Sequence, residues 1–263
     1  VLFKNKIPLF SWKNNLKFNF FDNYENKKIK NIAILMPIYD GVEETITAIN
    51  SVLSGLKKQN YYNYRFILGL DNPSNLKMKD EILNKFSQNS LFTVIINEEN
   101  KGFIGNCNNL FSKIGVFEDI LLLNSDIEAP KSFDWIQKLI DTAESDNKIG
   151  TVTPMSNAAS IFSFPNPNEY QGRFKNKTID QINDLFADNT EIIEVPSCHG
   201  FCTLIVNTRL KLNYLFDEMF GKGYGEENDL SMRINNLGYK NVSCSSVYIY
   251  HHESISFSEK KEE

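Results

Sequence analysis

The chain has 263 residues, of which 41% are hydrophobic and 23% are charged, and its net charge is −5 at pH 7. This composition is typical of a globular protein whose core is large enough to fold without a disulfide or a structural zinc ion. The negative charge argues against a nucleic-acid partner, and no apolar run reaches the roughly 18 residues that a membrane span requires.

The first 30 residues are aromatic and basic and show no clear period. Lysines and asparagines interrupt them, so they do not read as a signal peptide. We expect residues 1–30 to form an extension that packs on the main domain or links it to something missing. The chain begins at Val rather than Met, as a module of a longer protein would. Residues 258–263 are charged and are expected to form a frayed tail, which leaves 31–257 as a single domain.

Strand and helix patterns alternate in the first half of that domain. The expected strands are Ile32–Ile38, Arg65–Leu70, Phe92–Ile96 and Asp119–Leu123. The expected helices are Val42–Lys58, Met78–Phe86, Asn106–Ile114 and Phe133–Ala143. This alternation predicts an α/β fold with a mostly parallel sheet covered by helices on both faces.

The second half is mixed. A polar loop over residues 163–177 leads to Thr178, where T-I-D-Q is a capping box that opens a helix. Further along the chain we expect a strand Phe201–Val206, a helix Glu226–Leu237 capped by Gly238, and a strand Val242–Tyr250. The side chains of the two helices that should face inward are Ile179, Ile182, Leu185, Phe186, Leu230, Ile234 and Leu237.

The cysteines indicate neither a metal site nor a redox site. They form no C-x-x-C pair, and three histidines are few for completing a zinc shell. Cys198 and Cys202 lie four positions apart in a segment that reads as strand. Reduced, partly buried thiols are therefore expected at Cys107, Cys198, Cys202 and Cys244.

Polar side chains follow each of the first four strands, where ligands bind in an open α/β sheet. They are Tyr39 and Asp40, Asp71 and Asn72, Asn97 and Asn100, and the run Asn124-Ser125-Asp126. Neither G-x-G-x-x-G nor the phosphate-binding G-x-x-x-x-G-K-[ST] occurs. A nucleotide would therefore need another counter-charge, such as a divalent cation held by a carboxylate.

Each acidic strand end has two readings. Asp126 could hold that cation or could cap the segment after it, and position alone does not separate the two. Asp71 could accept a hydrogen bond from a nucleotide base or could form an Asx-turn with Ser74.

Two further groups of residues suggest chemistry. Glu226, Glu227 and Asp229 open a helix after a glycine-rich approach. The helix dipole favours acids there by ~0.3–1 kcal/mol, but three acids in four positions exceed what capping needs, and one is a candidate general base. His251 and His252 end the last strand, and since neighbours on a strand point to opposite sides, at most one can complete a metal shell.

Together, these segments resemble the inverting nucleotide-sugar glycosyltransferases of family 2, which have the GT-A fold. The likeness runs from about Ile32 to Phe257, and the order and spacing of the motifs carry it. The matching segments begin at Pro37 (P-I-Y), Asp71 (D-N-P-S), Asn100 (N-K-G-F), Leu122 (L-L-N-S-D), Thr153 (T-P-M-S-N), His199 (H-G-F-C), Phe216 (F-D-E) and Gly223 (G-Y-G-E-E-N-D-L).

The resemblance implies a nucleotide-sugar-binding half, 31–130, and an acceptor and catalytic half, 131–257. The implied donor-binding residues are Pro37, Tyr39, Asp71, Asn100, Gly102, Phe103, Asn108, Asn124 and Ser125. Asp126 and His251 would bind Mn²⁺ or Mg²⁺, and the ending H-x-x-S-x-S-F favours His251 over His252. Asn124 stands where the family usually has the first Asp of D-x-D, which implies a looser, exchangeable metal.

The implied catalytic base is Glu227, where the family more often has Asp, and Glu226 would orient the loop or contact the acceptor. The expected function is metal-dependent, inverting transfer of a sugar from a UDP- or dTDP-sugar to a hydroxyl of a glycan or glycoconjugate. The expected setting is the cytoplasm, including the inner face of a membrane or a larger protein. Two alternatives are a non-catalytic nucleotide- or carbohydrate-binding module and, ranked lower, a sugar-phosphate nucleotidyltransferase, which would need a glycine-rich basic loop after the first strand.

Overall fold

The computed structural model describes residues 29–56, 62–165, 174, 176–221 and 223–252. The expected extension up to residue 28, most of the loop over 163–177, the segment 254–257 and the tail lie outside these residues. Among the described helices, none is long and apolar enough to cross a membrane.

Four parallel strands form the first half of the sheet, as the sequence predicts. They are β1 (Lys30–Ile38), β2 (Tyr62–Leu70), β3 (Phe92–Ile96) and β4 (Glu118–Leu123). β1 and β4 are apolar runs buried on both faces, as expected for parallel strands covered by helices, whereas β3 lies at the edge of the sheet and is only partly buried.

The other five strands make the sheet mixed. They are β5 (Ile127–Glu128), β6 (Ile149–Ser156), β7 (Ile192–Val195), β8 (Cys202–Ile205) and β9 (Lys240–His251). β8 runs antiparallel to β4 and β6, β9 runs parallel to β6, and β5 and β7 run antiparallel to β9. The sheet order is β3-β2-β1-β4-β8-β6-β9-β5, with β7 beside β9.

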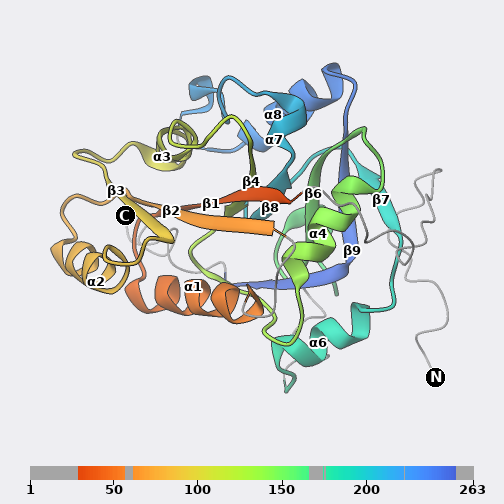
Figure 1. Ribbon diagram of the computed structural model, residues 1–263, viewed down its shortest axis with the longest axis horizontal. Coiled ribbons are helices and arrows are strands. Elements are labelled where there is room, and N and C mark those ends of the chain that lie inside the picture. The colour runs from red at the N-terminus through yellow and green to blue at the C-terminus, as the bar shows by residue number, and fades with distance from the viewer. Residues whose placement is uncertain (1–28, 57–61, 166–173, 175, 222, 253–263) are drawn as a thin grey trace, which may run out of the picture.

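Helices cover both faces of this sheet (Figure 1). The helices α1 (Val42–Leu56), α2 (Leu76–Phe86) and α4 (Trp135–Glu144) share one apolar cluster. The helices α3 (Gly102–Phe111) and α8 (Glu226–Asn236) share the other. The side chains of β1 pack alternately into one cluster and the other, because successive side chains on a strand point to opposite faces of the sheet.

Shorter elements complete the second half. The helix α6 (Ile179–Phe186) begins with the predicted capping box at Thr178 and stacks Phe186 on Tyr248 of β9, with ring centroids 5.2 Å apart. The turn α7 (Asn207–Leu210) follows β8, and the 3₁₀ turns η1 (Ser160–Phe162) and η2 (Glu218–Phe220) lie in the connecting loops.

Some sequence predictions were wrong. Leu185 and Leu237 were expected to face inward but are 43% and 56% exposed, because each lies at the last turn of a helix whose other apolar residues already fill the interface. The segment between Cys198 and Cys202 is a turn and not strand, and all four cysteines are buried free thiols. The helix α3 begins four residues before its predicted start at Asn106.

Candidate active site

The residues after β4 meet the end of β9. Ile127 of β5 pairs with His251 across an antiparallel bridge, and the N–H of His252 donates to the carbonyl of Asp126 at 3.0 Å. This pairing brings Nε2 of His251 within 3.3 Å of Oδ1 of Asp126. The two residues that the sequence analysis assigned to a cation therefore lie side by side, although 124 intervening residues separate them in the chain.

The hydrogen bonds of His251 select its tautomer. Its Nδ1 lies 2.8 Å from the carbonyl oxygen of Ala158, which can only accept, so Nδ1 carries the proton. The lone pair of a neutral ring is then on Nε2, which lies 3.2 Å from the side-chain amide of Asn124. The side chain of Asn157 exchanges two hydrogen bonds with the backbone of His251, both 2.8 Å long, and this fixes the strand end.

These groups fit a divalent cation. A neutral imidazole nitrogen whose other nitrogen donates to a backbone carbonyl is the usual form of a histidine ligand. Two ligand atoms ~2.0–2.2 Å from one metal ion at a near-right angle are ~3 Å apart, close to the observed 3.3 Å. The described part of the chain holds no group of three or more His, Cys, Asp or Glu side chains arranged around such a position.

The second acidic site lies at the start of α8. Oε1 of Glu227 accepts a 2.6 Å hydrogen bond from the N–H of Gly200, and its carboxyl group is partly buried. A Cβ atom on Gly200 would come within 2.8 Å of the same oxygen, so only glycine permits this approach. Burial raises the pKa of Glu227 above its ordinary value, while the hydrogen bond from Gly200 and the nearby His251 lower it in part.

Glu226 is buried more deeply, at 6% exposed. Burial and the charge of Glu227 both raise its pKa, against hydrogen bonds from backbone N–H groups. Its Oε2 has no hydrogen-bond partner among the described residues. The loop before it is held in the left-handed region at Gly223, Tyr224 and Gly225, and the ring of Tyr224 is 82% exposed at the rim of the site.

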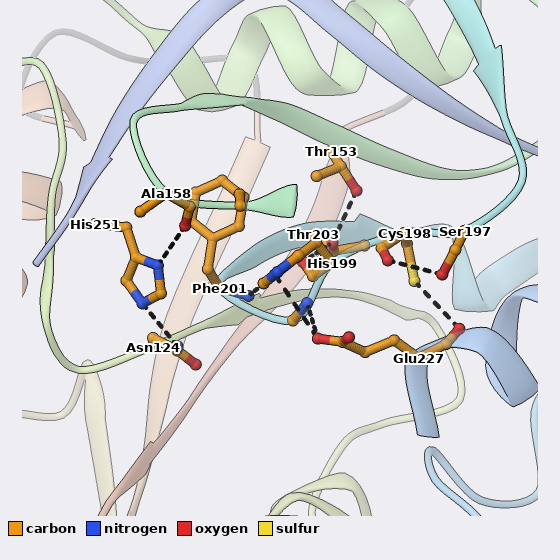
Figure 2. A network of polar contacts seen from close by, with 12 residues as sticks. Asn124, Thr153, Ala158, Ser197, Cys198, His199, Phe201, Thr203, Glu227 and His251 are labelled. Carbon is orange, nitrogen blue, oxygen red and sulfur yellow. Dashed lines mark hydrogen bonds and ion pairs between the residues drawn. The ribbon is translucent and has the colours of Figure 1, made fainter. Parts of the chain in front are cut away.

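The residues His199 and Phe201 lie between His251 and Glu227 (Figure 2). The ring of Phe201 packs against that of His251 on one side and that of His199 on the other, with ring centroids 5.5 Å apart in both pairs. Nδ1 of His199 lies 3.7 Å from Oε1 of Glu227. His199, Phe201 and Asn157 were not predicted as site residues, although each lies in a motif of the family resemblance, and those motifs were the signal that could have found them.

The strand ends on the far side of β4 form a polar network. Asp71 is buried, and its Oδ1 accepts hydrogen bonds from the side chain of Asn97 at 2.6 Å and from the N–H of Lys101 at 2.9 Å. Burial raises the pKa of Asp71, and these hydrogen bonds lower it in part. Asn97 also accepts from Asn109 at 2.7 Å, so the network joins the end of β3 to α3.

The other predicted donor-binding residues lie along the same edge of the sheet. Asn100 accepts from the N–H of Gly102 at 2.8 Å, and Gly102 has a φ of +69° with open space at its Cα. The amide of Asn108 makes hydrogen bonds of 2.9 and 3.0 Å with the backbone of Phe216, so it connects α3 to the loop before η2. The ring of Phe103 packs at a tilt against that of Phe216, with centroids 5.8 Å apart. Donor contacts by these residues remain predictions.

Three predicted donor residues complete this edge. Pro37 is buried in β1, and the ring of Tyr39 just beyond it is 42% exposed. Ser125 is partly buried between Asn124 and Asp126. A contact between these side chains and a nucleotide also stays a prediction.

Comparison with known proteins gives a family match. The model of the family described as "Glycosyl transferase family 2" matches residues 33–207. The search of curated protein sequences found no match.

Two of the similar solved structures have bound ligands. "Crystal structure of GalNAc-T7 with UDP, GalNAc and Mn2+" has a TM-score of 0.62 at 19% identity and covers 85% of this chain and 43% of that one. "Mannosyltransferase PcManGT from Pyrobaculum calidifontis in complex with GDP-Man and Mn2+" has a TM-score of 0.57 at 12% identity and covers 85% and 57%. The chain thus spans about half the length of these proteins, and at these identities the likeness is one of fold, which is the expected GT-A fold.

Proposed function

Because the chain belongs to glycosyl transferase family 2, we propose that it transfers a sugar from a nucleotide-diphosphate sugar to a hydroxyl group and inverts the anomeric configuration. The observation that supports this most directly is the position of two acidic groups on one edge of the sheet. Asp126 pairs with His251, and Glu227 lies beyond Phe201 at the start of α8. A leaving diphosphate and an attacking hydroxyl need two such groups on opposite sides of the transferred sugar.

The donor half of the proposal starts from the strand ends of β1 to β4. We propose that Tyr39 and Asp71 hold the base and ribose, and that Asn100, Gly102 and Phe103 lie along the diphosphate. UDP with Mn²⁺ and GDP-Man with Mn²⁺ are the ligands of the two similar structures. A UDP- or dTDP-sugar is our proposed donor for this chain.

For the cation, we propose that Asp126 and His251 bind Mn²⁺ or Mg²⁺. When bound, such a cation neutralises charge that develops on the departing diphosphate. Ala158 keeps the proton on Nδ1 of His251, so the lone pair is on Nε2, which lies beside the amide of Asn124 and Oδ1 of Asp126. Asn124 stands at the position where the family usually has a second aspartate. Its side-chain amide supplies a hydrogen-bond donor there in place of a carboxylate.

Glu227 is the proposed base. Its Oε1 is held by Gly200, which leaves Oε2 to take the proton of the acceptor hydroxyl. The hydroxyl oxygen then bonds to the anomeric carbon as the bond from that carbon to the diphosphate breaks on the opposite side. The raised pKa of Glu227 suits this role, because a base works best when its pKa approaches the working pH.

Glu226 is proposed to contact the acceptor. Its Oε2 is buried and lacks a partner among the described residues, and a hydroxyl of a bound glycan or glycoconjugate would supply one. The cytoplasmic setting, at the inner face of a membrane or within a larger protein, belongs to the same proposal.

A single set of assays tests the function. The purified chain is incubated with a panel of UDP-, dTDP- and GDP-sugars with Mn²⁺ or with EDTA, and the release of nucleoside diphosphate is measured. We expect release from one class of donor, loss of release with EDTA, and a product anomer opposite to that of the donor by NMR.

The variant Glu227→Gln tests the base, because the amide oxygen can still accept from Gly200. We expect turnover to fall by roughly 10²–10⁴-fold with donor affinity unchanged by calorimetry. Glu81→Gln on the exposed face of α2 is the matched control and should behave as the unaltered chain. Donor binding without turnover in any condition would instead favour a non-catalytic binding module.

A further inference from the structure

The backbone of His199 is held firmly beside the proposed base. Its carbonyl oxygen accepts a 2.6 Å hydrogen bond from the hydroxyl of Thr203, and that hydroxyl lies 2.9 Å from the hydroxyl of Thr153 on β6 (Figure 2). The ring packs edge-on against Phe201, with ring planes inclined by 70°. The imidazole is therefore positioned by two strands and by an aromatic neighbour.

The atom of His199 that faces Glu227 is an acceptor when the ring is neutral. Nδ1 lies 3.4 Å from the N–H of Phe201, which can only donate, so the lone pair is on Nδ1 and the proton on Nε2. The same Nδ1 lies 3.7 Å from Oε1 of Glu227. Two acceptors thus face each other, and neither stabilises the other while the ring is neutral.

Adding a proton to Nδ1 reverses this relation. A protonated imidazole 3.7 Å from a carboxylate oxygen forms an ion pair in a partly buried setting, where the attraction is stronger than in water. An ion-paired carboxylate is a weaker base, because the positive charge beside it lowers its pKa. The carboxylate group also faces the imidazole and not the acceptor.

We propose that His199 is a positioning residue for Glu227, and that protonation of its Nδ1 converts their contact into an ion pair that withdraws the base from the acceptor. The inference rests on the proposed function, because it assigns a partner to the base of that same site. It goes further by making transfer depend on the protonation state of His199.

Other ionisable groups surround the pair. Glu226 precedes Glu227 on α8, and Cys198 precedes His199 in its own loop. Burial raises the pKa of Cys198 to about 12, so its thiol stays neutral. Asp126 and His251 lie on the other side of the Phe201 ring. Oε1 of Glu227 lies in ion-pair range of the His199 ring, so the two residues take up their first shared proton as a coupled pair.

The first test is a pH profile of donor consumption at saturating Mn²⁺. His199→Asn removes the titrating ring and keeps an oxygen near the position of Nδ1, where it can accept from Phe201. We expect the acid limb of kcat/KM to move to lower pH by about one unit, since an opposite charge at this range shifts ionisation by that order. His252→Asn removes an exposed histidine outside the pair and should keep the wild-type profile. An unchanged acid limb in His199→Asn overturns the proposal.

The second test does not depend on turnover. The chain has three histidines, so the ring signal of His199 can be assigned in an NMR pH titration as the one that His199→Asn lacks. We expect its titration midpoint to fall by about one pH unit in Glu227→Gln, because the carboxylate that favours the protonated ring is gone. An equal midpoint in the two proteins overturns the pairing. Absence of sugar transfer by the unaltered chain would refute the proposed function, while this titration would still decide the pairing.

Discussion

Replacement of Gly200 by Ala perturbs the proposed base without touching its chemistry. A Cβ atom at this position would lie 2.8 Å from Oε1 of Glu227, whereas ordinary contacts begin at 3.4 Å, so the carboxylate must retreat by about 0.6 Å. Its 2.6 Å hydrogen bond from the N–H of Gly200 is stretched or lost. Gly200 is not in the left-handed region, so alanine adds no backbone strain.

The effect of this substitution on catalysis and its effect on stability can be measured separately. Misplacing a catalytic group by ~1 Å can cost ~10²-fold, so we expect kcat to fall by roughly 10–100-fold in Gly200→Ala. The free energy of unfolding should change by no more than about 1 kcal/mol, since alanine restricts the unfolded chain while the strained contact is at the end of a flexible side chain. Loss of the N–H donor also raises the pKa of Glu227 further, which should move the acid limb of activity to higher pH.

A matched glycine provides the control. Gly115 also donates its N–H to a carboxylate, that of Glu118, and its added Cβ would lie 3.2 Å from Oε2 of that residue. Glu118 begins β4 at the end of the sheet opposite the site and pairs with Arg65. Gly115→Ala should leave steady-state kinetics unchanged. Wild-type kcat in a folded Gly200→Ala variant would contradict the assignment of Glu227 as a base fixed by this loop.

Three further predictions concern other parts of the chain. Asp126→Asn keeps the shape of the side chain but removes its charge, so the Mn²⁺ concentration for half-maximal activity should rise by roughly 10–100-fold in a metal titration. Asn108→Ala removes two hydrogen bonds to Phe216 and should lower the free energy of unfolding in urea by about 1–3 kcal/mol; a raised KM for donor at unchanged stability would show a ligand contact instead. Burial raises the pKa of Asp134 to about 6, above that of an unfolded aspartate, so the folded state loses stability as pH rises from about 4 to about 6. Asp134→Asn, which can still cap α4 and accept from Tyr62, should therefore be more stable by about 1–2 kcal/mol at pH 7.5 and no more stable at pH 4.

The first half of the fold could be predicted because its strands are uniform. Each of β1 to β4 contains an apolar run. A helix with one apolar stripe follows β1, β2 and β3 directly and follows β4 after the two-residue β5, and β3 was predicted to the residue. Boundaries were less accurate where polar residues continue a strand, as at the start of β2, or where glycine lies inside a helix, as at Gly105 in α3.

Of the strands that complete the sheet, β8 and β9 were predicted as Phe201–Val206 and Val242–Tyr250, whereas β5, β6 and β7 were missed. For β6, the reason is that several of its buried positions are polar. Every residue of β6 is buried, yet the strand contains Thr151, Thr153 and Pro154. Thr151 donates to Asn241 of β9 at 2.7 Å, and Thr153 lies 2.9 Å from Thr203 of β8. These partners are distant in the sequence, so a pattern of apolar residues gives no sign of the strand. β5 has two residues and is defined only by its pairing with β9.

The candidate site, too, combines features that the local sequence predicts with features that depend on the pairing of distant strands. The position of Asp126 at a strand end could be predicted from the local sequence, but its contact with His251 depends on the pairing of β5 with β9. The environment of Glu227 depends on Gly200, which lies 27 positions earlier in the chain and reaches it only because β8 returns beside β4. Local patterns thus identify the acids, and long-range pairing decides which of them have partners.

Several features at the start of α8 would count as errors in a sequence chosen for stability alone. Glu226 and Glu227 are desolvated, and Tyr224 adopts a φ of +72° with its ring in solvent. The N-cap, Gly225, offers no side-chain hydrogen bond to the first turn. Each feature costs stability, and backbone hydrogen bonds offset the burial of Glu226 and Glu227 only in part. Such costs are tolerated where a ligand or a reaction uses them, which is why this helix end, more than the well-satisfied network around Asp71, is where we expect the acceptor to bind.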